Sequence, residues 1–89
     1  MLEMGVLRQN YPNPFRSATS IKYNIPERGN FKIDVIDMHG RVVDVLKKGN
    51  SSKGTYLVSW NATGKPDGFY FCRLRFKGHE NIIKMQVKR

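Results

Sequence analysis

Apolar residues recur at every second position in short runs along this chain, and each run ends at glycine, proline, asparagine or serine. In residues 19–25, for example, Ile21, Tyr23 and Ile25 fall on one side. A period of two is the pattern of half-buried β-strands, whereas an amphipathic helix repeats its apolar residues every three or four positions. The sequence therefore predicts an all-β fold.

The spacing of the runs predicts an immunoglobulin-like antiparallel β-sandwich. Counting the opening segment as one strand, we expect about seven short strands, which is typical of that architecture. The chain has 89 residues, enough for one domain over residues 1–89. The inward residues expected of two further runs are Phe31, Ile33 and Val35, and Tyr56, Val58 and Trp60. The expected connections are residues 26–30, 38–40, a polar loop over 47–53, and 61–68.

The last two runs, residues 69–76 and 81–87, predict a hairpin around Gly78-His79. In the favoured register Lys77 faces Glu80. The inner pairs are then Leu74 with Ile83, Cys72 with Met85 and Tyr70 with Val87. The outer face would hold Phe69, Phe71, Arg73, Arg75, Ile82, Lys84, Gln86 and Lys88.

This register also sets Arg73 opposite Lys84, and facing like charges destabilise a sheet. Either an anionic partner or a carboxylate on a neighbouring strand would offset that repulsion. The pair is thus the main residue-level indication of a recognition face. The last strand also leaves an edge that could pair with another chain.

The formal net charge is +9, and the charged residues are distributed unevenly along the chain. Residues 1–45 contain six Lys or Arg and five acids (+1), whereas residues 46–89 contain ten and two (+8). Such an excess suggests an anionic partner, whether nucleic acid, acidic glycan or lipopolysaccharide. A soluble basic surface without a partner explains the charge equally well.

The sequence offers little for catalysis, so we expect no enzyme activity and no cofactor or metal site. It contains no nucleophile elbow, zinc-protease motif or phosphate-binding glycine loop. His39 and His79 stand beside glycines in expected turns. Cys72 is the single cysteine and is expected to be a buried apolar residue. No apolar run is long enough to span a membrane.

Two binding functions compete with a structural or targeting role. Sugar-binding sandwiches use exposed aromatic rings, and the candidates here are Tyr11, Phe15, Trp60, Phe69 and Phe71. Trp60 falls on an inward position, which weakens this carbohydrate-binding alternative. Single-stranded nucleic acid could stack on Phe69 and Phe71 beside Arg73 and Arg75. We favour instead that these rings cover the sandwich edge or pack on a parent domain.

Several motifs, in order along the chain, resemble the type IX secretion C-terminal sorting domains, which are similar to the immunoglobulin-like domain of the hook-capping protein. The opening signature corresponds to residues 7–15, Leu-Arg-Gln-Asn-Tyr-Pro-Asn-Pro-Phe. Residues 19–26, 35–43, 54–61, 67–71 and 84–89 resemble the later blocks. Arg16 replaces the usual asparagine, and the loop before Gly68 is short for the family.

The resemblance implies a non-catalytic C-terminal module that directs secretion and surface attachment of a larger protein, here expected to be a hydrolase with its catalytic domain N-terminal to the module. It further implies export through the periplasm of a Gram-negative bacterium to the medium or outer cell surface. The expected partner is the secretion machinery, as the resemblance implies, or an anionic cell-surface glycan or lipopolysaccharide, as the basic charge suggests; a polysaccharide is the further alternative, and nucleic acid is not expected. The machinery would recognise folded features near the C-terminus, and the end would later be processed.

Residues 1–5 resemble no natural leader, so a signal peptide would lie on the parent. The expected recognition residues are Gly68, Phe69, Phe71, Arg73, Arg75, Lys84, Lys88 and Arg89.

Overall fold

The computed structural model describes residues 5–89, so the expectation about a leader lies almost wholly outside the described residues. The described chain is all β, as predicted, and no helix in it could cross a membrane. Seven strands follow one another: β1 (Val6–Leu7), β2 (Ala18–Ile25), β3 (Gly29–Ile36), β4 (Val42–Ser51), β5 (Gly54–Asn61), β6 (Gly68–Phe76) and β7 (His79–Val87).

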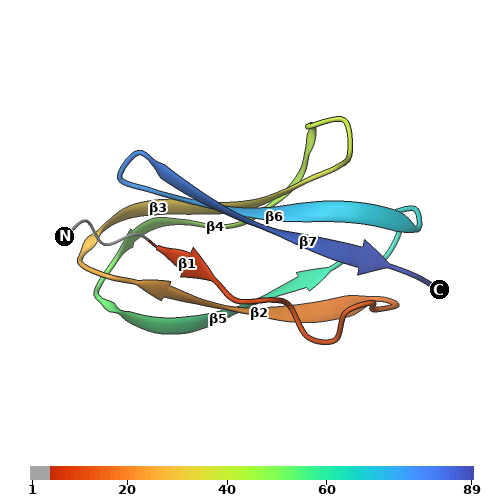
Figure 1. The fold of residues 1–89 in the computed structure, drawn as a ribbon, viewed down its shortest axis with the longest axis horizontal. Helices are drawn as coiled ribbons and strands as arrows, with labels where there is room; N and C mark the ends of the chain where they lie inside the picture. Colours follow the sequence, from red (N-terminus) through yellow and green to blue (C-terminus); the bar gives the residue numbers. More distant parts are fainter. Residues whose placement is uncertain (1–4) are drawn as a thin grey trace.

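The strands form two antiparallel sheets that pack face to face as a sandwich (Figure 1). One sheet has the order β1-β2-β5, and the other has the order β4-β3-β6-β7. β1 approaches β7 on one side of the sandwich, and β4 approaches β5 on the other.

Trp60 lies at the centre of the core and is fully buried. Phe15 and Tyr70 pack edge-on against its indole, with ring centroids 5.7 and 5.2 Å away. The inward positions predicted for residues 19–25 and 31–37 are confirmed, because their alternate apolar residues are buried. Of the third predicted set, Tyr56 and Val58 also face the core but are only partly covered.

The loop predicted over residues 47–53 is wrong, because β4 runs on to Ser51. Residues 47–51 pair with the first half of β3, and their polar character reflects an exposed edge strand. The register skips one β4 residue at two places, which identifies Val43 and Leu46 as bulge residues. Both bulge side chains pack partly against the core.

The predicted register of the final hairpin is wrong by two residues. The turn is Lys77-Gly78, both with positive φ (48° and 81°), and Phe76 faces His79. Positive φ at both central residues is the type I′ turn that suits the twist of a hairpin. Since side chains alternate with a period of two, this shift leaves both faces as predicted. It does change the partners: Arg73 faces Ile82, so the predicted repulsion with Lys84 does not occur.

The opening motif closes the edge of β7. Gln9 Nε2 donates to the Lys84 carbonyl (2.8 Å), and Asn13 Oδ1 accepts from the Gln86 amide (3.0 Å). Phe15 then pairs through its backbone with Gln86 and Lys88 (3.0 and 2.9 Å). We call residues 9–15 the clasp. The clasp thus occupies the edge of the last strand at residues 84–88, an edge that the sequence left open.

Asn10 holds the clasp in shape. It is 3% exposed, and its Nδ2 donates to the Pro12 carbonyl (3.1 Å) and to Thr19 Oγ1 (2.9 Å). Thr19 Oγ1 donates in turn to the Pro12 carbonyl (2.8 Å). A buried amide whose donors are satisfied in this way fixes a proline-rich segment that has few backbone donors of its own.

Asn13→Ala should loosen the clasp without unfolding the sandwich. It leaves the Gln86 amide without its side-chain acceptor, which should cost about 1 kcal/mol. Native-state hydrogen exchange should therefore accelerate at Gln86 more than at β3. Equal acceleration throughout the sheet would contradict a local role for Asn13.

Candidate recognition face

The outer face of the four-stranded sheet carries the residues expected to mediate recognition. Strand pairing aligns its side chains in rows across β4, β3, β6 and β7. One row is mostly apolar, the next contains an ion pair, and the third is basic. The rows are Val42, Ile36, Phe71 and Lys84; Val45, Asp34, Arg73 and Ile82; and Lys48, Lys32, Arg75 and Glu80.

Arg73 forms an ion pair with a buried carboxylate. Its Nε and Nη2 donate to the two oxygens of Asp34 at 2.9 and 2.8 Å. Asp34 is 1% exposed, and the Arg73 side chain is 14% exposed. The hydrogen bonds from Arg73 to Asp34 raise the pKa of the guanidinium. Asp34 of β3 is therefore the neighbouring-strand carboxylate that the sequence analysis considered. An external anion is not needed to balance the charge of Arg73.

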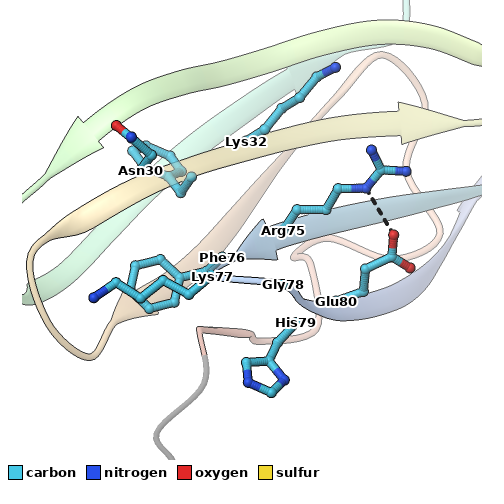
Figure 2. Close-up of a pocket in the computed structure, with 9 residues that line it drawn as sticks. Asn30, Lys32, Arg75, Phe76, Lys77, Gly78, His79 and Glu80 are labelled. Atoms are coloured by element: carbon cyan, nitrogen blue, oxygen red, sulfur yellow. Dashed lines mark hydrogen bonds and ion pairs between the residues drawn. The ribbon is translucent and has the colours of Figure 1, made fainter.

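Two further basic residues at the hairpin's turn end are paired at the surface. Arg75 Nε contacts Glu80 Oε2 at 2.8 Å, and Lys77 Nζ contacts Glu27 Oε1 at 2.7 Å. An open pocket of about 400 Å³ lies here, lined by residues of β3, β6, the turn and the start of β7. In Figure 2, Lys32 and Arg75 extend to one side, Lys77 to the other and His79 downward. Because these groups diverge, they do not converge on a single small anion.

At the opposite end of the hairpin, basic and aromatic groups are accessible together. Lys84 Nζ lies 4.2 Å from the centroid of the Phe69 ring, which is a cation–π distance. Phe69 is 36% exposed, Phe71 is half-buried, and Lys88 is exposed. Gly68 opens β6 with a φ of 149°, a conformation that side chains rarely adopt.

Arg89 anchors the end of the chain to the β5–β6 loop. Its amide and Nη1 donate to the two oxygens of Asp67, each at 3.0 Å. Nη1 and Nη2 also donate to the Lys65 and Ala62 carbonyls, each at 2.9 Å. The backbone hydrogen bond from Arg89, together with its side chain, lowers the pKa of Asp67. Sequence reasoning missed this contact, because no local pattern reports which loop the chain end meets.

Two of the five aromatic residues considered for sugar binding are in the core: Trp60, as its inward position predicted, and Phe15, which was expected to be exposed. Phe15 is 2% exposed and packs on Trp60, so neither ring can bind a sugar. Tyr11 is 82% exposed, but it belongs to the clasp and not to the hairpin face. Phe69 and the half-buried Phe71 are left on the sheet.

Cys72 is fully buried, as predicted, and burial raises the pKa of its thiol to about 12 from an ordinary value of 9.0. The native thiol should therefore resist thiol reagents at pH 8 and react only after unfolding. Because the folded pKa is the higher one, its contribution to stability is complete below pH 9 and is lost as the pH rises toward 12. Rapid alkylation of the folded chain would contradict this burial.

Within residues 5–89, no group of three His, Cys, Asp or Glu side chains is placed to hold a metal ion.

Comparison with known proteins gives one family. The model of the secretion system C-terminal sorting domain matches residues 9–88, from the first clasp residue past the end of β7. No curated protein matches the chain. Domains of this family are non-catalytic modules of secreted and cell-surface proteins, and they act through the type IX secretion machinery. With the match spanning nearly the whole chain, this protein belongs to the family of secretion system C-terminal sorting domains.

Proposed function

We propose that this module carries a longer parent protein out of the cell and attaches it to the cell surface. In this proposal the secretion machinery, or an anionic surface glycan or lipopolysaccharide, contacts Phe69, Phe71, Lys84 and Lys88. We call these four residues the hairpin patch. The observation that carries the proposal is the family match over residues 9–88.

The free charges favour this end of the hairpin. Arg73 and Arg75 are held by carboxylates, and Arg89 is held by Asp67. Within the described residues, Lys84 and Lys88 have no carboxylate within ion-pair distance. Of the eight expected recognition residues, these two lysines and the rings of Phe69 and Phe71 are therefore the groups left to meet a partner. Gly68, Arg73 and Arg89 are proposed to act by shaping and fixing the hairpin.

Preorganisation also supports recognition at this site. The clasp holds β7 along its edge, and Arg89 ties down the chain end immediately after Lys88. A partner that binds to a hairpin whose backbone is already ordered does not bear the entropy cost of ordering that backbone first. The patch is thus presented on a fixed β-hairpin, with its lysines at the surface.

The parent protein is proposed to be a hydrolase that passes through the periplasm of a Gram-negative bacterium. This part of the proposal rests on the sequence resemblance. Carbohydrate binding by the module itself has less support, since Phe15 and Trp60 are in the core.

Export of a reporter tests the proposal. A reporter with a signal peptide is fused to residues 1–89 and expressed in a host that has the type IX pathway. The fusion should reach the surface or the medium, and the reporter without the module should stay in the periplasm. Retention of the fusion, with the module folded and intact, would refute the proposal.

A further inference from the structure

The edges of the two sheets are protected very unequally. The clasp covers the edge of β7, and β1 is two residues long within the described chain. β4 carries two bulges, two lysines (Lys47 and Lys48) and the inward-pointing Asp44, whose Oδ2 accepts from Trp60 Nε1 at 3.1 Å. Bulges, lysines and inward charges are the devices by which edge strands resist pairing with other chains.

β5 has none of these protections. All eight of its residues, Gly54–Asn61, pair with β2 in one unbroken register. Its sequence, Gly-Thr-Tyr-Leu-Val-Ser-Trp-Asn, contains no charge and no proline, and most of its residues favour strands. No strand within residues 5–89 pairs with its other edge. Alternate backbone N–H and C=O groups of β5 therefore point away from β2, on the side where the described chain provides no pairing strand.

The core is also incompletely covered beside this edge. Tyr56 and Val58 of β5 face inward but are only partly buried, and so are Val43 and Leu46 of β4. In the middle of the sandwich, inward residues such as Ile33 and Val35 are fully buried. One added strand beside β5 would lie where it could complete the burial of Tyr56 and Val58.

We propose that β5 binds an extended segment of another protein as an additional strand, with apolar side chains facing the core and acidic side chains facing outward. The backbone edge supplies the main-chain hydrogen bonds of such β-augmentation, and the partly buried inner side chains of Tyr56 and Val58 supply an apolar surface for alternate residues of the added strand. This inference goes beyond the sorting function and is independent of the hairpin patch.

The positive charges near β5 favour an acidic partner. Lys22 of β2 is exposed and lies directly opposite Leu57 of β5. Lys53 is exposed in the β4–β5 turn. An outward residue on the added strand would lie roughly 10 Å from Lys22, two strand spacings away, within reach of two long side chains. A second copy of this chain would bring another formal charge of +9 to the same edge, which opposes association.

A synthetic peptide tests this directly on the purified chain. The probe is a capped heptapeptide that alternates glutamate and valine, with glutamate at both ends. One control peptide has lysine in place of glutamate, and another has proline in place of the central valine. Binding is measured by titration, and its location by hydrogen exchange of the β5 amides.

The glutamate peptide should bind and slow exchange along β5, and the lysine and proline peptides should bind at least about tenfold more weakly. Leu57→Glu places a like charge on the exposed outer side of β5 and should weaken binding by about tenfold. Ile82→Glu, a matched change at an exposed aliphatic residue of β7, should leave the affinity unchanged.

Equal binding of all three peptides would overturn the proposal, as would no binding or protection that falls outside β5. Dimerisation of the free chain with β5 protected would overturn the choice of an acidic partner in favour of a second copy. None of these outcomes depends on export, so a failure here is distinct from a failure of the sorting function.

Discussion

Arg73→Ala will lower the free energy of unfolding by about 3 kcal/mol, because it leaves the Asp34 carboxylate buried without its partner. Asp34 accepts two hydrogen bonds from Arg73 and is 1% exposed, so this guanidinium is the group that compensates its charge in the folded state. Urea-induced unfolding at neutral pH measures the loss.

The matched control is Arg75→Ala, two residues along the same face. Its partner Glu80 and its own side chain are each nearly half exposed, at 46% and 47%. Loss of such a surface pair should cost less than about 1 kcal/mol. The double variant Asp34→Val/Arg73→Met should recover most of the stability lost in Arg73→Ala, since it removes both charges. Similar losses for Arg73→Ala and Arg75→Ala would contradict the assigned role of the buried pair.

Trp60→Ala should destabilise the sandwich by about 3–5 kcal/mol, the range for removing a large aromatic side chain from a core. The indole is fully buried, packs against Phe15 and Tyr70, and donates to Asp44. Small domains have total stabilities of roughly 5–15 kcal/mol, so this one substitution should remove much of the margin. A shift of the thermal or urea midpoint measures it.

Leu57→Ala provides the control for Trp60→Ala on the same strand. Leu57 points outward and is 65% exposed, so its truncation should change stability by less than about 0.5 kcal/mol. Equal effects at positions 57 and 60 would mean that the inward and outward sides of β5 are assigned wrongly.

The alternation of apolar residues predicts which side of each strand faces the core, and the structure agrees for β2, β3, β6 and β7. It cannot predict register as well. A shift of two residues leaves both faces of a hairpin unchanged, so the periodicity fits both turns. Positive φ at Lys77 decides between them, and lysine has no strong local preference for that conformation.

The composition of β4 wrongly predicts a loop over residues 47–53 for a related reason. An edge strand protected by lysines and bulges contains the same residue types as a loop. Its membership in the sheet depends on pairing with β3, where Gly29 faces Ser51. Similarly, the partner of Arg73 lies on a strand 39 residues away, and strand order is not written in any local pattern.

The sequence therefore predicts which side chains lie on the outer face of the hairpin, but not which of them are paired. The outer positions of β6 and β7 follow from periodicity. The division between paired residues (Arg73, Arg75 and Arg89) and accessible ones (Lys84 and Lys88) follows from contacts with distant segments. The motif at residues 9–15 gains a physical explanation as well: it is hydrogen-bonded to residues 84–88, the segment that contains both accessible lysines.

Export of the reporter fused to a charge-reversed patch tests the central claim most directly. Lys84→Glu/Lys88→Glu reverses both accessible lysines of the patch, and Arg8→Glu/Lys48→Glu makes the same change of charge at two exposed positions outside the patch. Both variants must unfold at the same urea concentration as the original chain. We expect the patch variant to hold the reporter in the periplasm while the control variant is exported normally. Normal export of the patch variant, or equal failure of both variants, would contradict recognition at the hairpin patch.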